Sequence, residues 1–223
     1  MTEPLSAGSA GVPPTRWELA DHSGYGVHFA RLLVDGEDID GEARLADVLA
    51  PRGATVLDAG SGMGRVADGL VRRGHQVTAV EKDQALIAQS RKTFPEVTVV
   101  ESDILGLTPG LLEGQGRPSS YDLVVVVGNV MVLLAEGTER RALETLAALL
   151  APDGRMLVGF RMVGGPQNAR TYPAAAFVAD LEAAGLSVQH RFDSYSLSPT
   201  DDEDYAVWVL SARTLPGARA PRA

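Results

Sequence analysis

The chain contains no cysteine among its 223 residues. This absence excludes disulfide bonds and every zinc or iron–sulfur site that is built on thiolates. The four histidines show none of the spacings typical of a metal-binding helix, such as H-E-x-x-H. We therefore predict no metal site. A chain without disulfides also fits the reducing cytoplasm, which is the localisation that we expect.

Cations are scarce as well. The sequence has 20 Lys and Arg against 29 Asp and Glu, a formal net charge of −9, and it contains no Lys/Arg-rich run. Because a nucleic-acid backbone is bound mainly through clustered cations, we expect no nucleic-acid partner. A long apolar run is also missing, since the stretch 123–135 is too short to span a bilayer. Residues 1–14 lack the apolar core of a signal peptide, so we expect no membrane partner.

The chain does contain a glycine-rich turn after a short apolar run. Residues 56–65 read V-L-D-A-G-S-G-M-G-R, so that Asp58 ends the run and Gly60, Gly62 and Gly64 alternate after it. Glycine at such positions permits positive φ and lets a ligand approach the backbone. The predicted helix that follows points its N-terminal amides and positive dipole end at that ligand. We predict a nucleotide-like cofactor at this turn.

The spacing of the glycines distinguishes between cofactors. A dinucleotide fingerprint reads G-x-G-x-x-G, and its third glycine would fall at Arg65. A P-loop requires Lys followed by Ser or Thr, which is absent here. An NAD(P)-dependent oxidoreductase is therefore the less favoured alternative. From these residues alone, a tight turn without any ligand also stays open.

Polar residues stand at the ends of the next three predicted strands. Glu81 and Asp103 end the second and third strands, and Asn129 follows the fourth. Ligands of open α/β sheets bind outside these ends, and an acid such as Glu81 can accept hydrogen bonds from two adjacent ribose hydroxyls. Glu81→Ala is then expected to weaken cofactor binding with little loss of fold. Two simpler interpretations remain open, with Glu81 a solvated loop acid and Asp103 the cap of a turn.

Alternating strands and helices, with no proline inside a strand, predict a parallel sheet with helices on both faces. The last two strands, 187–192 and 205–213, are joined by a polar loop without a helix pattern and should pair antiparallel. The predicted fold is α/β, a Rossmann-like doubly wound sheet of seven strands, mostly parallel with an antiparallel last strand.

The D-x-G-x-G-x-G turn, the acids at the next two strand ends and the closing antiparallel pair resemble the class I S-adenosylmethionine-dependent methyltransferases, over a predicted α/β core at 42–213. The chain looks most similar to the small-molecule type. The resemblance implies S-adenosylmethionine as cofactor, with Asp103 accepting from the adenine amino group and Ile104 packing on the ring. The implied cofactor-binding residues are Asp58, Gly60, Ser61, Gly62, Glu81, Lys82, Asp103, Ile104 and Asn129.

The domain organisation follows from the same resemblance. A single methyltransferase domain is expected over 16–213, with a helical lid at 16–41 that includes a helix over 17–33. The Gly-, Ser-, Ala- and Pro-rich start, 1–15, and the end, 214–223, are expected to be flexible tails. The expected oligomeric state is a monomer or a homodimer.

The implied activity is transfer of a methyl group by in-line displacement, in which the protein mainly holds the acceptor and the methyl carbon close and aligned. The alternative is a protein of the same fold that binds an adenosyl ligand without transfer. Enzymes that methylate amino groups of DNA bases or protein glutamine carry [ND]-P-P-[YF] after the fourth strand, whereas residues 128–131 here read G-N-V-M. By elimination, we expect a small-molecule acceptor.

The acceptor pocket is expected between the lid and the end of the fourth strand. His22, His28 and Asn129 are the candidate catalytic residues, although two histidines six positions apart do not share one face of a regular helix. Trp17 and Tyr25 could equally be packing residues. The candidate acceptor-lining residues are Trp17, Tyr25, Met131, Arg161 and Tyr172, with Asn168, Arg170 and Tyr195 near them.

Overall fold

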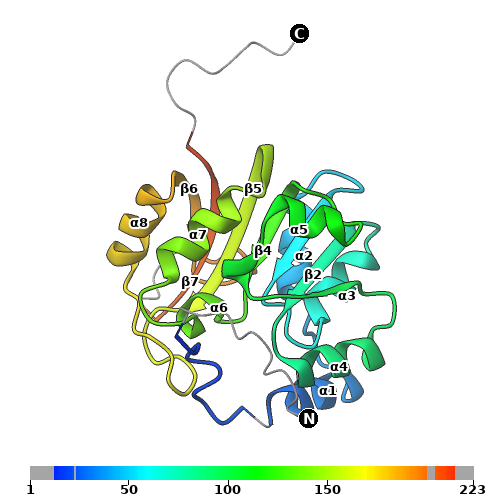
Figure 1. Ribbon diagram of the computed structural model, residues 1–223. Helices are drawn as coiled ribbons and strands as arrows, with labels where there is room; N and C mark the ends of the chain where they lie inside the picture. Colours follow the sequence, from blue (N-terminus) through cyan, green and yellow to red (C-terminus); the bar gives the residue numbers. More distant parts are fainter. Residues whose placement is uncertain (1–12, 23, 200–203, 214–223) are drawn as a thin grey trace, which may run out of the picture.

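The computed structural model describes residues 13–22, 24–199 and 204–213. Most of the two expected tails, 1–12 and 214–223, lies outside these ranges. One sheet forms the centre of the molecule, in the strand order β3-β2-β1-β4-β5-β7-β6 (Figure 1). Its strands are β1 Thr55–Ala59, β2 Gln76–Glu81, β3 Val99–Glu101, β4 Tyr121–Val126, β5 Leu150–Arg161, β6 Leu186–Phe192 and β7 Tyr205–Ala212.

The pairing of the strands confirms the predicted fold. Strands β1 to β5 are parallel, whereas β7 lies between β5 and β6 and pairs antiparallel with both. Parallel strands covered by helices are buried on both faces, and Val124, Val125 and Val126 of β4 are each 0% exposed. None of the described helices is long and apolar enough to cross a membrane.

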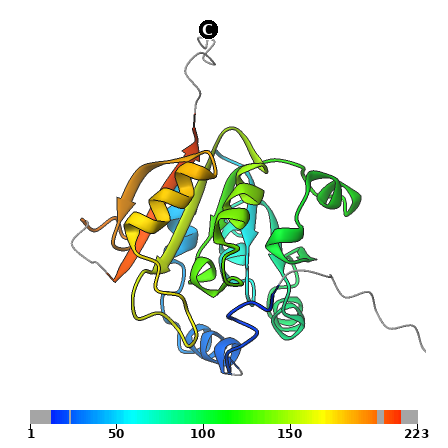
Figure 2. The same ribbon diagram turned by 60° about the vertical axis from the view of Figure 1, so that its left-hand side comes forward.

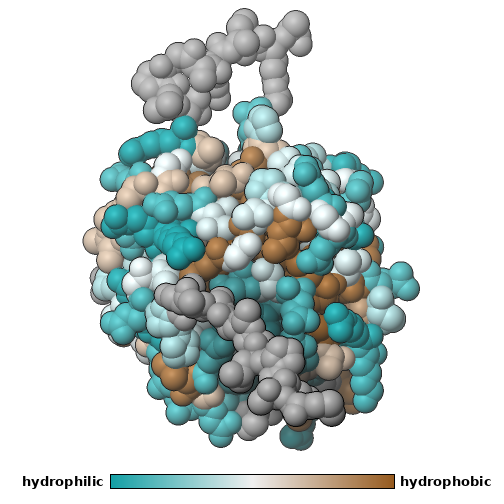
Figure 3. All heavy atoms as spheres, viewed as in Figure 1, coloured by the Kyte–Doolittle hydropathy of each residue, from teal (hydrophilic) through white to brown (hydrophobic). Residues whose placement is uncertain are grey.

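Helices cover both faces of the sheet through two separate hydrophobic clusters. One cluster packs Leu143 of α7 and Phe177 of α8 on one face, where Figure 2 shows both helices. The other packs Leu45 of α2 and Leu70 of α3 on the opposite face. On the side drawn in Figure 3, hydrophilic residues predominate between smaller hydrophobic groups. The helices are α1 Tyr25–Val34, α2 Gly41–Leu49, α3 Arg65–Val71, α4 Gln84–Thr93, the 3-10 helix η1 Ile104–Gly106, α5 Pro109–Gly114, α6 Val130–Leu133, α7 Glu139–Ala147 and α8 Ala174–Ala183.

The N-terminal lid differs from the helix predicted over 17–33. Helix α1 begins only at Tyr25, and residues 15–22, which we name the strap, form turns before it. Thr15, expected in a flexible tail, is 6% exposed and pairs with Ala135 in an isolated antiparallel bridge. The folded part of the chain therefore starts earlier than predicted.

Hydrogen bonds to a distant segment explain the late start of α1. The backbone amides of Arg16 and Trp17 donate to the carbonyls of Leu134 and Leu133, at 3.4 and 3.2 Å. A backbone that is paired in this way does not form the intrahelical bonds that a helix over the same residues requires. The strap and α1 lie at the edge of the sheet where the parallel strands end, the lower edge in Figure 1.

Leu143→Ala is expected to destabilise the fold, because Leu143 lies on the buried face of α7 and is 0% exposed. Truncation of a buried leucine lowers the free energy of unfolding by about 2–5 kcal/mol. The matched control is Leu19→Ala, at a side chain that is 62% exposed, where we expect a change within about 0.5 kcal/mol. Urea unfolding measures both variants. Equal midpoints would contradict the packing described above.

Candidate cofactor and acceptor site

Three glycines in the left-handed region build the turn between β1 and α3. The φ angles are 77° at Gly60, 58° at Gly62 and 88° at Gly64. A Cβ on Gly60 would lie 2.6 Å from the side chain of Val130, so that position has no room for one. Gly62 is different, because the nearest atom to its Cβ would be in the Tyr25 ring at 3.6 Å. The open side of Gly62 leaves its backbone accessible to a ligand.

The carboxylate of Glu81 ties this turn to the end of β2. Its Oε2 accepts from the Gly62 amide at 2.9 Å, and its Oε1 accepts from the amides of Lys82 and Asp83 at 2.8 and 2.9 Å. Glu81 is 8% exposed, and burial raises its pKa although the three amides lower it. It is therefore not a solvated loop acid. Since three backbone bonds depend on Glu81, we now expect Glu81→Ala to lower fold stability as well.

Asp103 follows β3 and has two roles in the structure. Its Oδ1 caps η1 by accepting from the Leu105 amide at 2.9 Å, as the simpler sequence interpretation suggested. Its Oδ2 lies 3.0 Å from Lys82 Nζ. Ile104, next in the chain, is 6% exposed. Asp103 lines a pocket although it also caps η1, so its roles as a cap and as a cofactor-binding residue are compatible.

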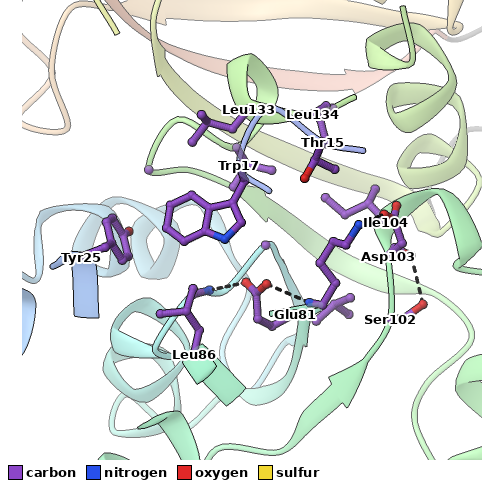
Figure 4. A pocket seen from close by; sticks show the side chains of 16 residues that line it. Thr15, Trp17, Tyr25, Glu81, Leu86, Ser102, Asp103, Ile104, Leu133 and Leu134 are labelled. Carbon is purple, nitrogen blue, oxygen red and sulfur yellow. Dashed lines mark hydrogen bonds and ion pairs between the residues drawn. The ribbon is translucent and has the colours of Figure 1, made fainter. Parts of the chain in front are cut away.

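A large pocket with about 650 Å³ of empty space opens between these residues. Most of the predicted cofactor residues line it. Trp17 and Tyr25, predicted on the acceptor side, line it too, and Figure 4 shows the Trp17 indole projecting into it beside Tyr25 and near Glu81. The lining residues are Thr15, Trp17, Tyr25, Gly60, Gly62, Val80, Glu81, Lys82, Leu86, Ser102, Asp103, Ile104, Gly128, Val130, Leu133 and Leu134.

A smaller pocket of about 320 Å³ adjoins the large one on the other side of the glycine turn. The two pockets share Tyr25, Gly60 and Gly128, so these residues mark the junction between them. The remaining residues of the smaller pocket are Phe29, Asp58, Ser61, Met63, Arg65, Val66 and Val127.

Two buried polar atoms of the smaller pocket lack partners among the described residues, namely one carboxylate oxygen of Asp58 and the hydroxyl of Ser61. Asp58 is 2% exposed. Burial raises its pKa to about 7, although Arg65 and a hydrogen bond from the Ala67 backbone lower it. Because buried polar groups are normally satisfied, these atoms indicate a place for a ligand that donates hydrogen bonds.

The side chain of Asn129 makes a structural hydrogen bond after β4. Its side-chain Oδ1 accepts from the backbone amide of Arg161 at 2.8 Å, and its backbone amide donates to the Gly159 carbonyl at 3.3 Å. With φ at 74°, Asn129 follows β4 and is the N-cap residue of α6. It therefore joins β4 to β5 and is not among the residues that line either pocket.

The structure does not bring the remaining acceptor candidates to the pockets. Met131 is 0% exposed in the core, and Tyr172, also 0% exposed, donates its hydroxyl to Asp180 at 2.6 Å. Arg161 is exposed at the end of β5. Of the three, Met131 and Tyr172 are packing residues, because their side chains turn into the hydrophobic cluster under α7 and α8.

Residues near the acceptor candidates have structural partners of their own. Asn168 donates to the Leu19 carbonyl at 2.8 Å, Arg170 pairs with Glu139 at 3.0 Å, and the Tyr205 hydroxyl donates to that of Tyr195 at 2.9 Å.

Neither candidate histidine lines a pocket. His28 is exposed on α1, and His22 Nε2 lies 3.2 Å from Asp83 Oδ2. The His22 ring also stacks on Trp17, with ring centroids 3.9 Å apart. The structure therefore gives neither of them a position next to the junction.

Some pocket residues were missed by the sequence analysis. Arg65 donates to the Ile39 carbonyl at 2.8 Å and to the Glu42 carboxylate, and its guanidinium lies 4.9 Å from the Phe29 ring centroid. It thereby connects the glycine turn to the lid, and its place directly after the glycines was a usable signal. No local pattern pointed to Leu133, because that residue reaches the pocket only through the fold.

A model of the methyltransferase domain matches residues 56–154. The crystal structure of a TehB-like S-adenosylmethionine-dependent methyltransferase from Corynebacterium glutamicum is 33% identical, with a TM-score of 0.74, and the match covers 86% of this chain and 97% of that one. The chain belongs to the S-adenosylmethionine-dependent methyltransferases. The cofactor implied by the sequence, S-adenosylmethionine, is thereby confirmed.

Curated relatives of this methyltransferase are named ribosomal RNA small subunit methyltransferase A. The protein from Leptothrix cholodnii is 33% identical over 127 residues, which are 56% of this chain and 43% of that protein. The protein from Dehalococcoides mccartyi is 27% identical over 179 residues, 72% of this chain and 59% of that protein. The chain thus spans about half the length of these relatives.

The residues present fit S-adenosylmethionine. Glu81 and Asp103 place carboxylate oxygens in the large pocket, which suits ribose hydroxyls and an adenine amino group. The unpartnered oxygen of Asp58 in the smaller pocket suits an ammonium group. Gly62 lines the large pocket, where a side chain would occupy space beside Tyr25 and obstruct a ligand that reaches both pockets.

Gly62→Val is expected to abolish binding of S-adenosylhomocysteine, because the side chain fills the space beside Tyr25 and its φ of 58° strains a branched residue. The matched control is Gly110→Val, where a Cβ meets nothing within 4 Å. Thermal unfolding with the ligand at about 100 times its dissociation constant should show about 2.7 kcal/mol of stabilisation in the control only. Normal binding by a folded Gly62→Val protein would contradict the site.

Asp58 makes stability depend on pH. Its pKa is raised from 3.8 to about 7 by folding, so between these values the folded protein holds a proton that the unfolded chain has released. The free energy of unfolding should fall as pH rises through this window, by at most about 1.4 kcal/mol per pH unit.

The comparison is with Asp58→Asn, which does not titrate and should lack this slope. Urea unfolding of both ligand-free proteins from about pH 5 to about pH 8 measures the difference. The difference should level off above about pH 7. A constant difference throughout would show that Asp58 titrates normally in the fold.

Proposed function

We propose that this methyltransferase transfers the methyl group to a small molecule whose reacting atom reaches the junction of the two pockets. One observation carries the proposal, which is that Tyr25 lines both pockets. A Cβ on Gly62 or Gly128 would lie 3.6 or 3.9 Å from the Tyr25 side chain, so α1 closes over the junction.

In this proposal the residues that line each pocket have separate roles. Glu81 and Asp103 accept hydrogen bonds from the nucleoside in the large pocket, and Asp58 accepts from the amino group in the smaller one. When bound, S-adenosylmethionine supplies a methyl group that is already activated by the positive sulfur. Tyr25 and the glycine turn then orient the reactants and exclude water, and such positioning accounts for about 7–11 kcal/mol in well-aligned reactions.

The charges beside the pocket support a small molecule over RNA. Lys82, the cation that lines the large pocket, already pairs with Glu18 and Asp103, each at 3.0 Å. Binding of a phosphate backbone requires available cations, and this surface offers carboxylates instead.

The pockets also suggest what the acceptor must provide. Among the described residues, no histidine lines either pocket. A histidine base would contribute about 10²–10⁴-fold where a proton must leave before transfer. We therefore propose an acceptor whose nucleophile needs no such base, such as a neutral amine or an ionised phenol.

The test is formation of S-adenosylhomocysteine from S-adenosylmethionine by the purified protein with separate acceptor classes. We expect turnover with a panel of small amines and phenols and none with small-subunit ribosomal RNA. Tyr25→Ala should lose most of the turnover, and Leu19→Ala should keep it. Turnover with RNA alone would overturn the acceptor class. Tight binding of S-adenosylhomocysteine without turnover in any arm would favour a protein that binds the ligand without transfer.

A further inference from the structure

We infer that the strap is a wall of the nucleoside site, and that Trp17 contacts the bound cofactor and slows its dissociation. The inference rests on S-adenosylmethionine as the cofactor. It concerns residues that lie outside the 56–154 match to the methyltransferase model. Trp17 was predicted on the acceptor side, and in the structure it lines the large pocket together with Glu81 and Asp103.

One end of the strap is fastened to the segment around α6. Besides the backbone bonds to Leu133 and Leu134, Arg16 pairs with Glu139 at 3.1 Å. Glu139 is 2% exposed and also binds Arg170 at 3.0 Å. The buried Glu139 carboxylate, paired with both guanidiniums, thus fixes the position of Arg16 beside α7.

The other end is fastened across the pocket to the loop after β2. The Trp17 indole donates to Asp83 Oδ2 at 2.9 Å, and Glu18 Oε2 lies 3.0 Å from Lys82 Nζ. His22 Nε2 approaches the same Asp83 oxygen at 3.2 Å. The strap therefore bridges the pocket between α6 and the start of α4.

The Trp17 ring is held in a fixed orientation by its neighbours. His22 stacks on it at 3.9 Å between ring centroids, and Tyr25 meets it edge-on at 5.2 Å. Figure 4 shows the ring beside Tyr25 and below Leu133, pointing into the pocket above Glu81. An aromatic wall that is ordered before binding gains contact energy at little cost in conformational entropy.

Lys82 links the strap to the adenine end of the pocket. Its Nζ lies 3.0 Å from Glu18 Oε2 and 3.0 Å from Asp103 Oδ2. The two pairs are half-exposed, so each contributes little by itself, and we assign the main effect to Trp17.

The test measures the dissociation rate of S-adenosylhomocysteine by displacement with excess unlabelled ligand. Trp17→Ala should dissociate about 10-fold faster than wild type, and Glu18→Gln less than about 5-fold faster. Trp17→Phe, which keeps an aromatic ring, should fall between wild type and Trp17→Ala. Leu19→Ala, on the same strap with its side chain 62% exposed, is the control and should not change the rate.

A second readout separates contact from fold stability. The chain has two tryptophans, and Trp208 is 2% exposed in the core, so a change in indole emission on ligand addition should come from Trp17 and disappear in Trp17→Phe. Unfolding without ligand is measured for each variant. An unchanged dissociation rate in folded Trp17→Ala, or an emission change that survives in Trp17→Phe, would overturn the role of Trp17 but not the cofactor assignment. Failure of wild type to bind would overturn the cofactor assignment with it.

Discussion

The buried carboxylate of Glu81 holds together the two loops from which the cofactor pocket is made. A carboxylate at 8% exposure requires several hydrogen-bond donors, and here three backbone amides provide them. The requirement works in both directions. The Gly62 amide must point at Glu81, which fixes the glycine turn, and the Asp83 amide must do the same, which fixes the start of α4.

The position of Asp83 carries this constraint further. Its Oδ1 caps α4 through the amides of Ala85 and Leu86, and its Oδ2 accepts from the indole of Trp17. Although burial raises it, these hydrogen bonds hold the pKa of Asp83 below its usual value. The glycine turn, the loop after β2 and the strap thus depend on one another through two neighbouring acids.

Those parts of the site that could be predicted from sequence are local. The glycines, the acid at the end of β2 and the cap at Asp83 are each defined by a few neighbouring residues and by the spacing of one βα unit. The strap could not be predicted, because its course is decided by bonds such as that between Trp17 and Asp83, which are 66 residues apart. The same residues have a helical pattern, but these long-range contacts keep them out of a helix.

The acceptor candidates show a second limit. Met131 and Tyr172 do follow strand ends as predicted, yet both side chains turn into the core. In a strand, the alternation of side chains shows which residues face one way. That alternation stops where a strand ends, and Met131 already lies in α6, so nearness to a strand end in sequence says little about the direction of a side chain.

The positions of the strap and of α1 over the two pockets have a consequence for the catalytic cycle. The strap crosses the large pocket, whereas α1 covers the junction through Tyr25, and the Tyr25 ring meets Trp17 of the strap edge-on. A movement of α1 that opens the junction would therefore also disturb the aromatic wall beside the nucleoside. We expect acceptor exchange and cofactor release to be coupled through this pair of rings.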